Sequence, residues 1–340
     1  MVRQRLHCQR TQRTQRTEHL LMKKLRVGVI GVGHLGQHHA RLYASLAGSV
    51  LAGVVDADPD RARLVAERHG TSVFGDPAAL LEKVDAVSVA VPTSSHYAVA
   101  KACLAAGVHV LVEKPIALTP GEARELVDLA RARGRVLQVG HIERFNPGIR
   151  SVRPHIGKPA FVECHRLSPF GERGTDVDVV LDLMIHDLDM VLSFHPGPVE
   201  EVRAAGVPVL SSNIDIANAR IVFGSGCVAN LTASRVSTTR MRRLRLFQRD
   251  AYVSVDYQTR QGMICRRVTG RHGRPEIEIE HVKGGDEEPL KLQIEAFLQA
   301  VKTGSPPPVS GEDGVAALEL AQQVLEAIGA FVRRHTGEKG

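Results

Sequence analysis

Three polar side chains recur at helical spacing in the otherwise apolar segment 179–192, which reads VVLDLMIHDLDMVL. Asp182, His186 and Asp189 stand at i, i+4 and i+7, so on an α-helix they form one narrow polar stripe. A carboxylate beside an imidazole is a suitable pair for moving a proton near neutral pH. The ordinary alternative is a solvated helix face with a satisfied histidine, and the choice between the two depends on the rest of the chain.

A glycine-rich turn lies near the start of the chain, in the segment 25–36, LRVGVIGVGHLG. A short β-branched run enters Gly31-Val-Gly33-His34-Leu35-Gly36 and a helical stretch follows. Gly31 permits a tight bend, Gly33 lets the backbone approach a pyrophosphate, and Gly36 lets the helix pack close to the strand. The phosphates would then meet the free N–H groups at the start of the helix.

An acidic residue ends the second predicted strand, 50–55, at the position where a dinucleotide ribose is bound. Asp56 lies 20 residues after Gly36 and can accept hydrogen bonds from the adenosine ribose hydroxyls. Asp58 follows, so a 2′-phosphate would face two negative charges and no adjacent arginine. This pattern favours NAD over NADP. Asp58 is also a good N-cap for a helix that begins at Pro59.

The alternation of strands and helices continues through the first half of the chain. Apolar runs at 87–91, 108–112 and 136–139 are typical of strands buried on both faces, and helical segments separate them. The sequence therefore predicts a doubly wound parallel sheet, whose ligands bind beyond the carboxyl ends of the strands. Three polar segments fall at such ends: 92–96 (PTSSH), 113–115 (EKP) and 140–146 (GHIERFN).

The composition of the chain is that of a globular protein with room for two domains. It has 340 residues, of which 43% are hydrophobic and 24% charged. The sequence contains no run of about 18 apolar residues, so it does not suggest a membrane span. Five scattered cysteines without CxxC spacing argue against zinc, other metal sites and disulfides, and favour a reducing cytoplasm.

Much of the net charge of +7 comes from the first residues of the chain. Five arginines and one glutamate within 1–21 contribute +4, so the remainder is only modestly basic and predicts no nucleic-acid partner. Residues 1–24 are expected to be a basic disordered extension or an upstream start-codon reading. A basic arm that touches nucleic acid is the alternative.

The second half changes pattern, from continuous apolar runs to strands of alternating or mixed polarity. These are predicted at 161–167, 199–205, 217–223, 226–235, 243–247, 251–257 and 262–268, with late helices at 290–301 and 314–333. They predict an α+β domain with a large, mainly antiparallel open sheet. The expected domains are therefore a dinucleotide-binding domain at 25–146 and a substrate-binding and oligomerisation domain at 147–340.

Taken together, GVGHLG, VPTSSH, VEKP, GHIERFNP and DLMIHDLD resemble the glucose–fructose oxidoreductase/inositol dehydrogenase (Gfo/Idh/MocA) family. The resemblance runs from about residue 25 to the C-terminus, and EKP followed by D-x-x-x-H is its most specific part. It implies an NAD(P)-dependent oxidoreductase of sugars or polyols that uses no metal. It also implies that Lys114, Asp182 and His186 converge beside the nicotinamide.

These residue types suit the oxidation of a secondary alcohol, in which a hydride leaves carbon as the hydroxyl loses its proton. The imidazole of His186, with an ordinary pKa near ~6.5, can take that proton, and the ammonium of Lys114 can stabilise the developing alkoxide. Asp182 can orient the imidazole or bind a neighbouring hydroxyl. Whether the histidine or the lysine is the formal base stays open.

The resemblance also suggests roles for residues around this centre. The residues expected to line the nicotinamide side are Pro92, Thr93, His96 and Glu113. For Arg144 and Asn146 we expect substrate contact. At Asp187 and Asp189, substrate contact and simple helix solvation are both open. His141 departs from the family pattern, and its role is open.

A cluster of arginines, Arg240, Arg242, Arg243 and Arg245, with Arg235 just before it, bears on the substrate. The cluster is either a solvated charge run or an anion subsite, since guanidinium groups suit phosphate oxygens. An anion subsite, with Arg235 as a substrate contact, would favour a nucleotide-linked sugar.

GHIERFNP and DLMIHDLDM resemble the branch of the family that oxidises the C3 hydroxyl of UDP-N-acetylglucosamine to a ketone for a later aminotransferase. That branch implies a place in lipid A biosynthesis. The family resemblance implies that the open sheet face is often an oligomer interface, so we expect a homodimer or homotetramer, and the cysteines favour the cytoplasm. Two alternatives stay open. One is an inositol or free-hexose dehydrogenase of the same family. The other is a non-catalytic NAD-binding sensor or scaffold, against which the joint presence of Lys114, Asp182 and His186 argues.

Overall fold

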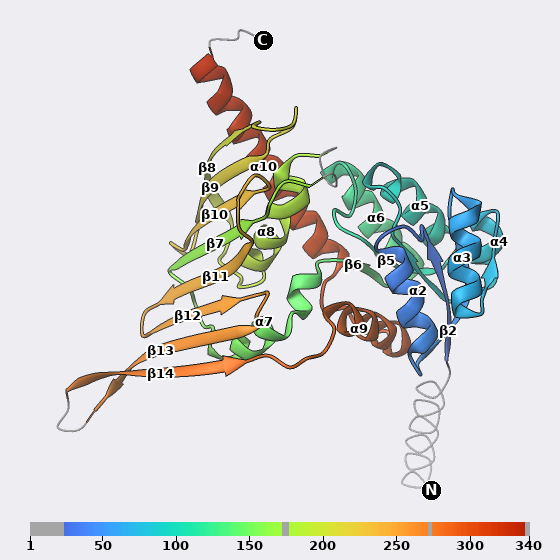
Figure 1. The fold of residues 1–340 in the computed structure, drawn as a ribbon, viewed down its shortest axis with the longest axis horizontal. Helices are drawn as coiled ribbons and strands as arrows, with labels where there is room; N and C mark the ends of the chain where they lie inside the picture. The colour runs from blue at the N-terminus through green and yellow to red at the C-terminus, as the bar shows by residue number, and fades with distance from the viewer. Residues whose placement is uncertain (1–23, 172–176, 271–273, 337–340) are drawn as a thin grey trace, which may run out of the picture. The chain divides into compact units, whose positions relative to one another are not determined.

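The structure is a computed structural model that describes residues 24–171, 177–270 and 274–336 (Figure 1). Nearly all of the predicted basic extension, residues 1–24, lies outside the described residues. The chain divides into two compact units. The first unit contains the chain up to Gly140 together with Leu290–Glu312, and the second contains His141–Pro289 and the chain from Asp313.

A parallel sheet of six strands forms the centre of the first unit, in the order β3-β2-β1-β4-β5-β6. The strands are β1 (Leu25–Ile30), β2 (Ser49–Val55), β3 (Ser72–Val73), β4 (Ala86–Val89), β5 (His109–Val112) and β6 (Leu137–Val139). Every neighbouring pair is parallel. All four residues of β4 are buried, as expected of a strand covered on both faces. The predicted doubly wound sheet is confirmed.

The helices of this unit begin and end at residues whose chemistry favours those ends. They are α2 (Gly36–Ser45), α3 (Pro59–His69), α4 (Pro77–Leu81), α5 (Thr93–Ala105), α6 (Pro120–Arg133) and α9 (Pro289–Thr303). Asp58 caps α3 ahead of Pro59, as predicted, and α6 begins with a capping box between Thr119 and Glu122. Gly134 ends α6 in the left-handed conformation.

Residues 290–312 group with the first unit, whereas the sequence assigns them to the second domain at 147–340. The physical reason is the free edge of β6. Val139 N–H donates to the Val309 carbonyl (3.1 Å), and the Gln138 side chain donates to the Gln293 carbonyl (3.1 Å). The returning chain therefore completes hydrogen bonds that the edge strand would otherwise leave open.

The second unit contains an eight-stranded sheet, in the order β14-β13-β12-β11-β7-β10-β9-β8. Its strands are β7 (Phe161–Leu167), β8 (Val199–Val207), β9 (Ile216–Phe223), β10 (Val228–Ser234), β11 (Met241–Gln248), β12 (Ala251–Asp256), β13 (Gln261–Thr269) and β14 (Pro275–Lys283). All neighbours pair antiparallel except β7 and β10, which are parallel. The predicted mainly antiparallel sheet is confirmed, while β14 is an additional strand.

One face of this sheet packs on helices, and the strands alternate accordingly. The helices of the second unit are η1 (Ile142–Phe145), α7 (Pro147–Val152), η2 (Arg153–His155), η3 (Val180–Met184), α8 (Ile185–Leu192) and α10 (Gly311–Thr336). Leu244 and Leu246 of β11 share a buried core with Leu188 of α8 and Val324 of α10. This packing holds α8 on the sheet and fixes which of its side chains stay accessible.

The last helix, α10, is the one described helix that is long and apolar enough, over 311–333, to cross a membrane by length and composition. Ala317, Leu320 and Val324 on this helix belong to the core of the second unit. Packing of the helix on the sheet accounts for its apolar composition.

Candidate active site

The glycine turn of the first unit has the close approaches that its sequence predicts. Gly31 has φ +84°, and a Cβ placed there would lie 2.7 Å from the carbonyl of Ala90. A Cβ at Gly36 would lie 1.8 Å from the carbonyl oxygen of Gly31. At Gly33, in contrast, a Cβ would meet only the guanidinium of Arg61, at 3.5 Å. The first and third glycines therefore permit the turn itself, and the second leaves its outer surface open.

The first turn of α2, which follows the glycine turn, suits an anion. Leu35 stands at the N-cap and makes no side-chain capping hydrogen bond, and no acidic residue lies in the first turn of the helix. The N–H groups of Gln37, His38 and His39 donate to the carbonyls of Gly33 and Leu35, and the helix dipole adds positive potential at this end of α2. The pyrophosphate of a dinucleotide fits this position.

A cavity of about 850 Å³ lies against this turn within the first unit. Its volume is in the range of small-molecule binding sites. Of the predicted cofactor residues, it is lined by Gly31, Gly33, His34, Leu35, Asp56 and Pro92. Asp58, Arg61 and Ser95 line it as well.

Asp56 is fixed at the carboxyl end of β2, where the ribose was predicted to bind. Its Oδ2 accepts a hydrogen bond from Val32 N–H (2.7 Å), and its Oδ1 accepts one from Asp58 N–H (2.9 Å). A carboxylate oxygen can accept two hydrogen bonds, so each retains capacity for a ribose hydroxyl. The acid thus joins the glycine turn to β2 while it stays in the cavity wall.

The prediction that no arginine stands near this acid is wrong. Arg61 extends from α3 to within 3.8 Å of Asp56 Oδ1, and its Nη2 donates to Asp58 Oδ2 at 2.9 Å. The backbone N–H of Arg61, and then its guanidinium, lower the pKa of Asp58. The sequence spacing concealed this contact because one turn of α3 brings Arg61 back over the residues that precede the helix.

Glu113, at the carboxyl end of β5, belongs to a buried hydrogen-bonded chain. Its Oε1 lies 3.1 Å from Nε2 of His39, whose Nδ1 lies 2.9 Å from the Ser88 hydroxyl. The Ser88 hydroxyl in turn lies 2.8 Å from the hydroxyl of Tyr43. Burial alone would raise the pKa of Glu113, but the hydrogen bond and charge of His39, aided by Lys114, hold it below its ordinary value. Glu113 therefore supports the position of its neighbour Lys114.

Lys114 itself is half-buried and is followed by the cis peptide bond to Pro115. His96 is buried, with Nδ1 2.7 Å from the Pro115 carbonyl and Nε2 2.9 Å from the Val91 carbonyl. Burial lowers the pKa of His96. His96 thus ties the EKP turn to the end of β4, and its expected contact with the cofactor stays a prediction. Thr93 is the first residue of α5 and is half-buried.

In the second unit, Asp182 and His186 lie on either side of a change in helix type. Asp182 is in the π-helical turn η3 and His186 is in the first turn of α8. Both are half-buried. The ring of buried His141 packs edge-on against that of His186, with centroids 6.3 Å apart and planes at 90°. His141, whose role the sequence left open, thus limits the orientation of the His186 ring.

Two buried arginine–carboxylate pairs hold the polar residues that flank His186. Arg144 donates to both carboxylate oxygens of Asp189 (2.8 and 2.7 Å) and to Asp313 (3.2 Å). Arg166 donates to both oxygens of Asp187 (2.9 and 2.8 Å). Asp187 and Asp189 are buried in these ion pairs, so the predicted alternative of simple helix solvation is wrong, and substrate contact stays a prediction. Arg144 holds Asp189 and Asp313, and its predicted substrate contact also stays a prediction.

Asn146, for which substrate contact stays a prediction, also has a structural role. It is buried, its Oδ1 accepts from Gly148 N–H (2.9 Å) to cap α7, and its Nδ2 donates to Glu143 and to the Tyr257 carbonyl (3.1 Å each). Glu143 also accepts from Arg166 Nη1 at 2.8 Å. The sequence gave no sign of Arg166, because an arginine within a strand looks like a solvent-facing residue.

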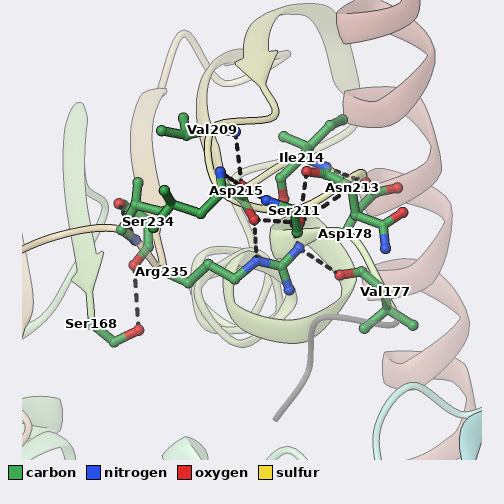
Figure 2. Close-up of polar contacts among 12 residues, drawn as sticks. Ser168, Val177, Asp178, Val209, Ser211, Asn213, Ile214, Asp215, Ser234 and Arg235 are labelled. Carbon is green, nitrogen blue, oxygen red and sulfur yellow. Dashed lines mark hydrogen bonds and ion pairs between the residues drawn. The ribbon is translucent and has the colours of Figure 1, made fainter. Parts of the chain in front are cut away.

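The predicted substrate contact Arg235 is buried in a separate hydrogen-bonded cluster, shown in Figure 2. Its Nε donates to Asp215 Oδ1 (2.8 Å) and its Nη2 to the carbonyls of Val177 (2.8 Å) and Ile214 (3.0 Å). Burial alone would raise the pKa of Asp215, but the Ser211 hydroxyl and nearby backbone N–H groups lower it. Arg235 therefore organises the loop before β9.

The glycine turn, the uncapped start of α2 and the acid at the end of β2 define a dinucleotide-binding protein of the Rossmann class. The comparisons with known proteins agree. A family described as an oxidoreductase family with an NAD-binding Rossmann fold matches residues 25–141, and the GFO/IDH/MocA C-terminal domain matches residues 149–254.

Several relatives span almost the whole chain. The UDP-N-acetylglucosamine 3-dehydrogenase of Acidithiobacillus ferrooxidans is 42% identical over 315 residues, which cover 92% of this chain and 100% of the relative. The Myo-inositol 2-dehydrogenase of Thermotoga maritima is 29% identical over 325 residues, or 89% of this chain and 96% of the relative.

Solved structures agree in fold. A structure of the Acidithiobacillus ferrooxidans enzyme matches with a TM-score of 0.86 over 92% of this chain and 100% of its own. A levoglucosan dehydrogenase in complex with NADH and levoglucosan, only 18% identical, matches with a TM-score of 0.81 over 91% of this chain and 98% of its own, which is a likeness of fold. The chain belongs to the Gfo/Idh/MocA family and is an NAD-dependent oxidoreductase. The residues around the cavity of the first unit fit NAD.

Proposed function

We propose that the protein oxidises the C3 hydroxyl of UDP-N-acetylglucosamine to the 3-keto sugar. The observation that carries this proposal is the 42% identity to the Acidithiobacillus ferrooxidans UDP-N-acetylglucosamine 3-dehydrogenase along that relative's full length. The relative that acts on myo-inositol is 29% identical over a comparable length. Inositol is therefore the second candidate substrate.

The proposed catalytic residues are Lys114, Asp182 and His186. NAD, when bound, supplies the acceptor for the hydride. His186 accepts the hydroxyl proton, and the Lys114 ammonium stabilises the negative charge that develops on the oxygen. Asp182 orients the imidazole or a neighbouring hydroxyl. Lys114 follows Glu113, which has a buried hydrogen bond to His39, and His186 precedes Asp187, which Arg166 holds.

The experiment is a substrate comparison with the full chain and NAD⁺. UDP-N-acetylglucosamine, myo-inositol and glucose are offered separately, and NADH is followed by its absorbance. We expect turnover on UDP-N-acetylglucosamine, with the 3-keto product identified by mass spectrometry. Turnover on a free polyol but not on the nucleotide sugar would reject the proposed substrate. NAD binding without turnover on any of the three would favour a sensor or scaffold.

We further propose that the protein is a cytoplasmic homodimer or homotetramer, joined through the open face of the eight-stranded sheet. Three aromatic side chains gather there: the rings of Phe161 and Phe247 are 5.7 Å apart, and those of Phe247 and Tyr252 are 5.0 Å apart. Phe247 is exposed, and covering such rings favours association. Phe247→Glu should shift the mass measured by light scattering toward the monomer, and an unchanged mass would reject this interface.

The proposed product sets the next reaction. A ketone at C3 of an amino sugar is a substrate for a sugar aminotransferase, which would install a second nitrogen. We therefore place the protein before such an enzyme, in the synthesis of a lipid A of diamino-sugar type. Coupled assays with a purified sugar aminotransferase would detect the aminated product.

A further inference from the structure

The arginines that follow β10 do not share one environment, because β11 presents alternate residues to opposite faces of the sheet. Arg243 and Arg245 alternate with buried Leu244 and Leu246, so they lie on the open face. There Arg243 is 3.8 Å from Asp256, and Arg245 is 3.4 Å from Glu163. By the same alternation Arg242 lies on the opposite face, the one that carries the core and α8.

Arg242 stands directly opposite Arg166 in the register of β11 with β7. The two cations differ in what neutralises them. Arg166 is buried and holds Asp187 and Glu143 at hydrogen-bonding distance, whereas the Arg242 side chain is 44% exposed. Among the described residues, the one carboxylate within 4 Å of Arg242 is Glu143, at 3.8 Å.

Glu143 is already engaged by other donors. Its Oε1 accepts from Arg166 at 2.8 Å and its Oε2 accepts from Asn146 at 3.1 Å. Arg242 is thus a partly desolvated cation beside a second cation, Arg166. Its carboxylate partner, Glu143, is shared with Arg166 and lies at the longer distance of 3.8 Å from Arg242. Burial, and then the charge of Arg166, lower the pKa of Arg242. Like charges opposite each other on neighbouring strands destabilise a sheet, and a bound anion would relieve that repulsion.

This position is also connected to the proposed catalytic helix. Asp187, which Arg166 holds with two hydrogen bonds, immediately follows His186 on α8. The guanidinium group is planar with several donors, so it suits phosphate oxygens better than a lysine would. An anion bound at Arg242 would therefore lie on the same face of the sheet as His186. The ion pair between Arg166 and Asp187 would separate the two.

We propose that Arg242 is the anchor for the diphosphate of a nucleotide-sugar substrate. The inference deepens the proposed function and rests on it, since inositol and glucose carry no phosphate. It assigns the anion subsite to one arginine of the cluster. Arg243 and Arg245 are excluded by their position on the open face, and Arg235 is excluded by its burial against Asp215. Arg240 is excluded because it is exposed in the loop before β11 and so lacks the partial desolvation of Arg242.

The test compares Arg242→Gln with Arg243→Gln. The control is well matched, because Arg243 is 39% exposed and also lies 3.8 Å from a single carboxylate, but on the other face of the same strand. UDP binding to the full chain is measured by calorimetry, and steady-state kinetics are measured with UDP-N-acetylglucosamine and with NAD⁺. We expect Arg242→Gln to weaken UDP binding and raise the KM for the sugar nucleotide by about tenfold or more. The kcat and the KM for NAD⁺ should change less than about threefold, and Arg242→Lys should recover part of the loss.

The outcomes separate this inference from the proposed function. If the wild type turns over UDP-N-acetylglucosamine and Arg242→Gln keeps the wild-type KM and UDP affinity, the inference is wrong and the proposed function stands. An equal loss of UDP affinity in Arg243→Gln would also reject the inference, because the loss would then follow from removing a positive charge on either face of β11. If the wild type neither binds UDP nor oxidises the nucleotide sugar, the proposed function fails and this inference fails with it. Unchanged NAD binding and melting temperature establish that Arg242→Gln is folded.

Discussion

Lys114 and His186 are half-buried side chains at the ends of well-packed elements, so each can be replaced with little loss of packing. We expect Lys114→Met and His186→Ala to lower kcat with UDP-N-acetylglucosamine by at least about a hundredfold, since each removes a group that acts in the transition state. Calorimetric affinity for NAD should change by less than about threefold. Lys101→Met, which removes an ammonium paired with Glu125 on the same unit, is the control and should keep its rate. Near wild-type turnover in either variant would contradict the proposed roles.

The choice between NAD and NADP depends on how Arg61 is held. Asp58 both caps α3 and binds the Arg61 guanidinium, so Asp58→Asn keeps the cap while it removes the charge. We expect this variant to release Arg61 toward a 2′-phosphate and to raise the ratio of kcat/KM for NADP⁺ over NAD⁺ by about tenfold. Asp60→Asn, two residues further along at the start of the same helix, should leave the ratio unchanged. A ratio in Asp58→Asn equal to that of the wild type would show that Arg61 does not set the preference.

At the level of single residues, the sequence located the groups near the site better than it assigned their roles. Asp56 and the glycines were predicted from local spacing, and local contacts do position them. Asn146 and Arg235 were expected to contact substrate, and Asp187 to contact either substrate or solvent, and the structure gives each a buried partner that is far away in the sequence. Spacing along one chain gives no information about such partners, because the register of distant strands decides them.

The helix that carries His186 is held by ion pairs with little access to water. Arg166→Met would leave Asp187 and Glu143 buried without their cation, and removing one partner of a buried pair costs about 3–5 kcal/mol. We therefore expect a large fall in the midpoint of thermal unfolding, followed by calorimetry. Arg203→Met, which breaks an exposed pair with Glu201, should cost at most about 1 kcal/mol. Similar losses of stability in the two variants would mean that the buried ion pair stabilises the fold no more than the exposed one.

The polar stripe of this helix departs from the regular pattern that the sequence predicts. A uniform α-helix over 179–192 would place Asp182, His186 and Asp189 on one line, but the first turn is the π-helix η3. Asp189 is fully buried with Arg144, so only Asp182 and His186 remain half-accessible. π-Helical turns are frequent at functional sites, and apolar periodicity does not reveal them. The sequence thus identified the element but could not predict its internal register.

Across the whole molecule, acid sensitivity can be assigned to particular groups. His109 Nδ1 accepts a hydrogen bond from Val136 N–H (2.8 Å), and burial, followed by the charge of Arg135, lowers the pKa of His109 to about 4. The unfolded chain therefore takes up this proton first as the pH falls. The stabilising contribution is complete above about pH 6.5 and is lost progressively down to about pH 4.

We expect His109→Gln to flatten this dependence of the melting temperature on pH between about 6.5 and 4. The exposed His281, changed to glutamine, is the control and should leave the slope as it is in the wild type. If His109→Gln keeps the wild-type slope of melting temperature against pH, other groups are responsible for the acid sensitivity. The depressed pKa values of Glu113 and Asp215 act at lower pH, because their stabilising effect is lost only as those carboxylates are protonated.

The division of the chain into two units was predictable only in part. The change from βα alternation to alternating strands marked the boundary near residue 140, but nothing local indicated that α9 belongs with the first unit. β14 was missed because it has no buried face, with Ile277 77% and Ile279 56% exposed. The alternation of apolar and polar residues predicts strands that cover a core, and it misses strands that extend beyond the core.

β14 is an edge strand, and it leaves a row of backbone N–H and C=O groups at the edge of the sheet. A strand of another chain could pair with these groups. Glu276, Glu278 and Glu280 alternate with its isoleucines, and their mutual repulsion keeps such a chain away at neutral pH. Acidification would neutralise these carboxylates while the edge stays in place. Below the ordinary pKa of a glutamate, β14 would therefore lose this particular protection against pairing with another chain.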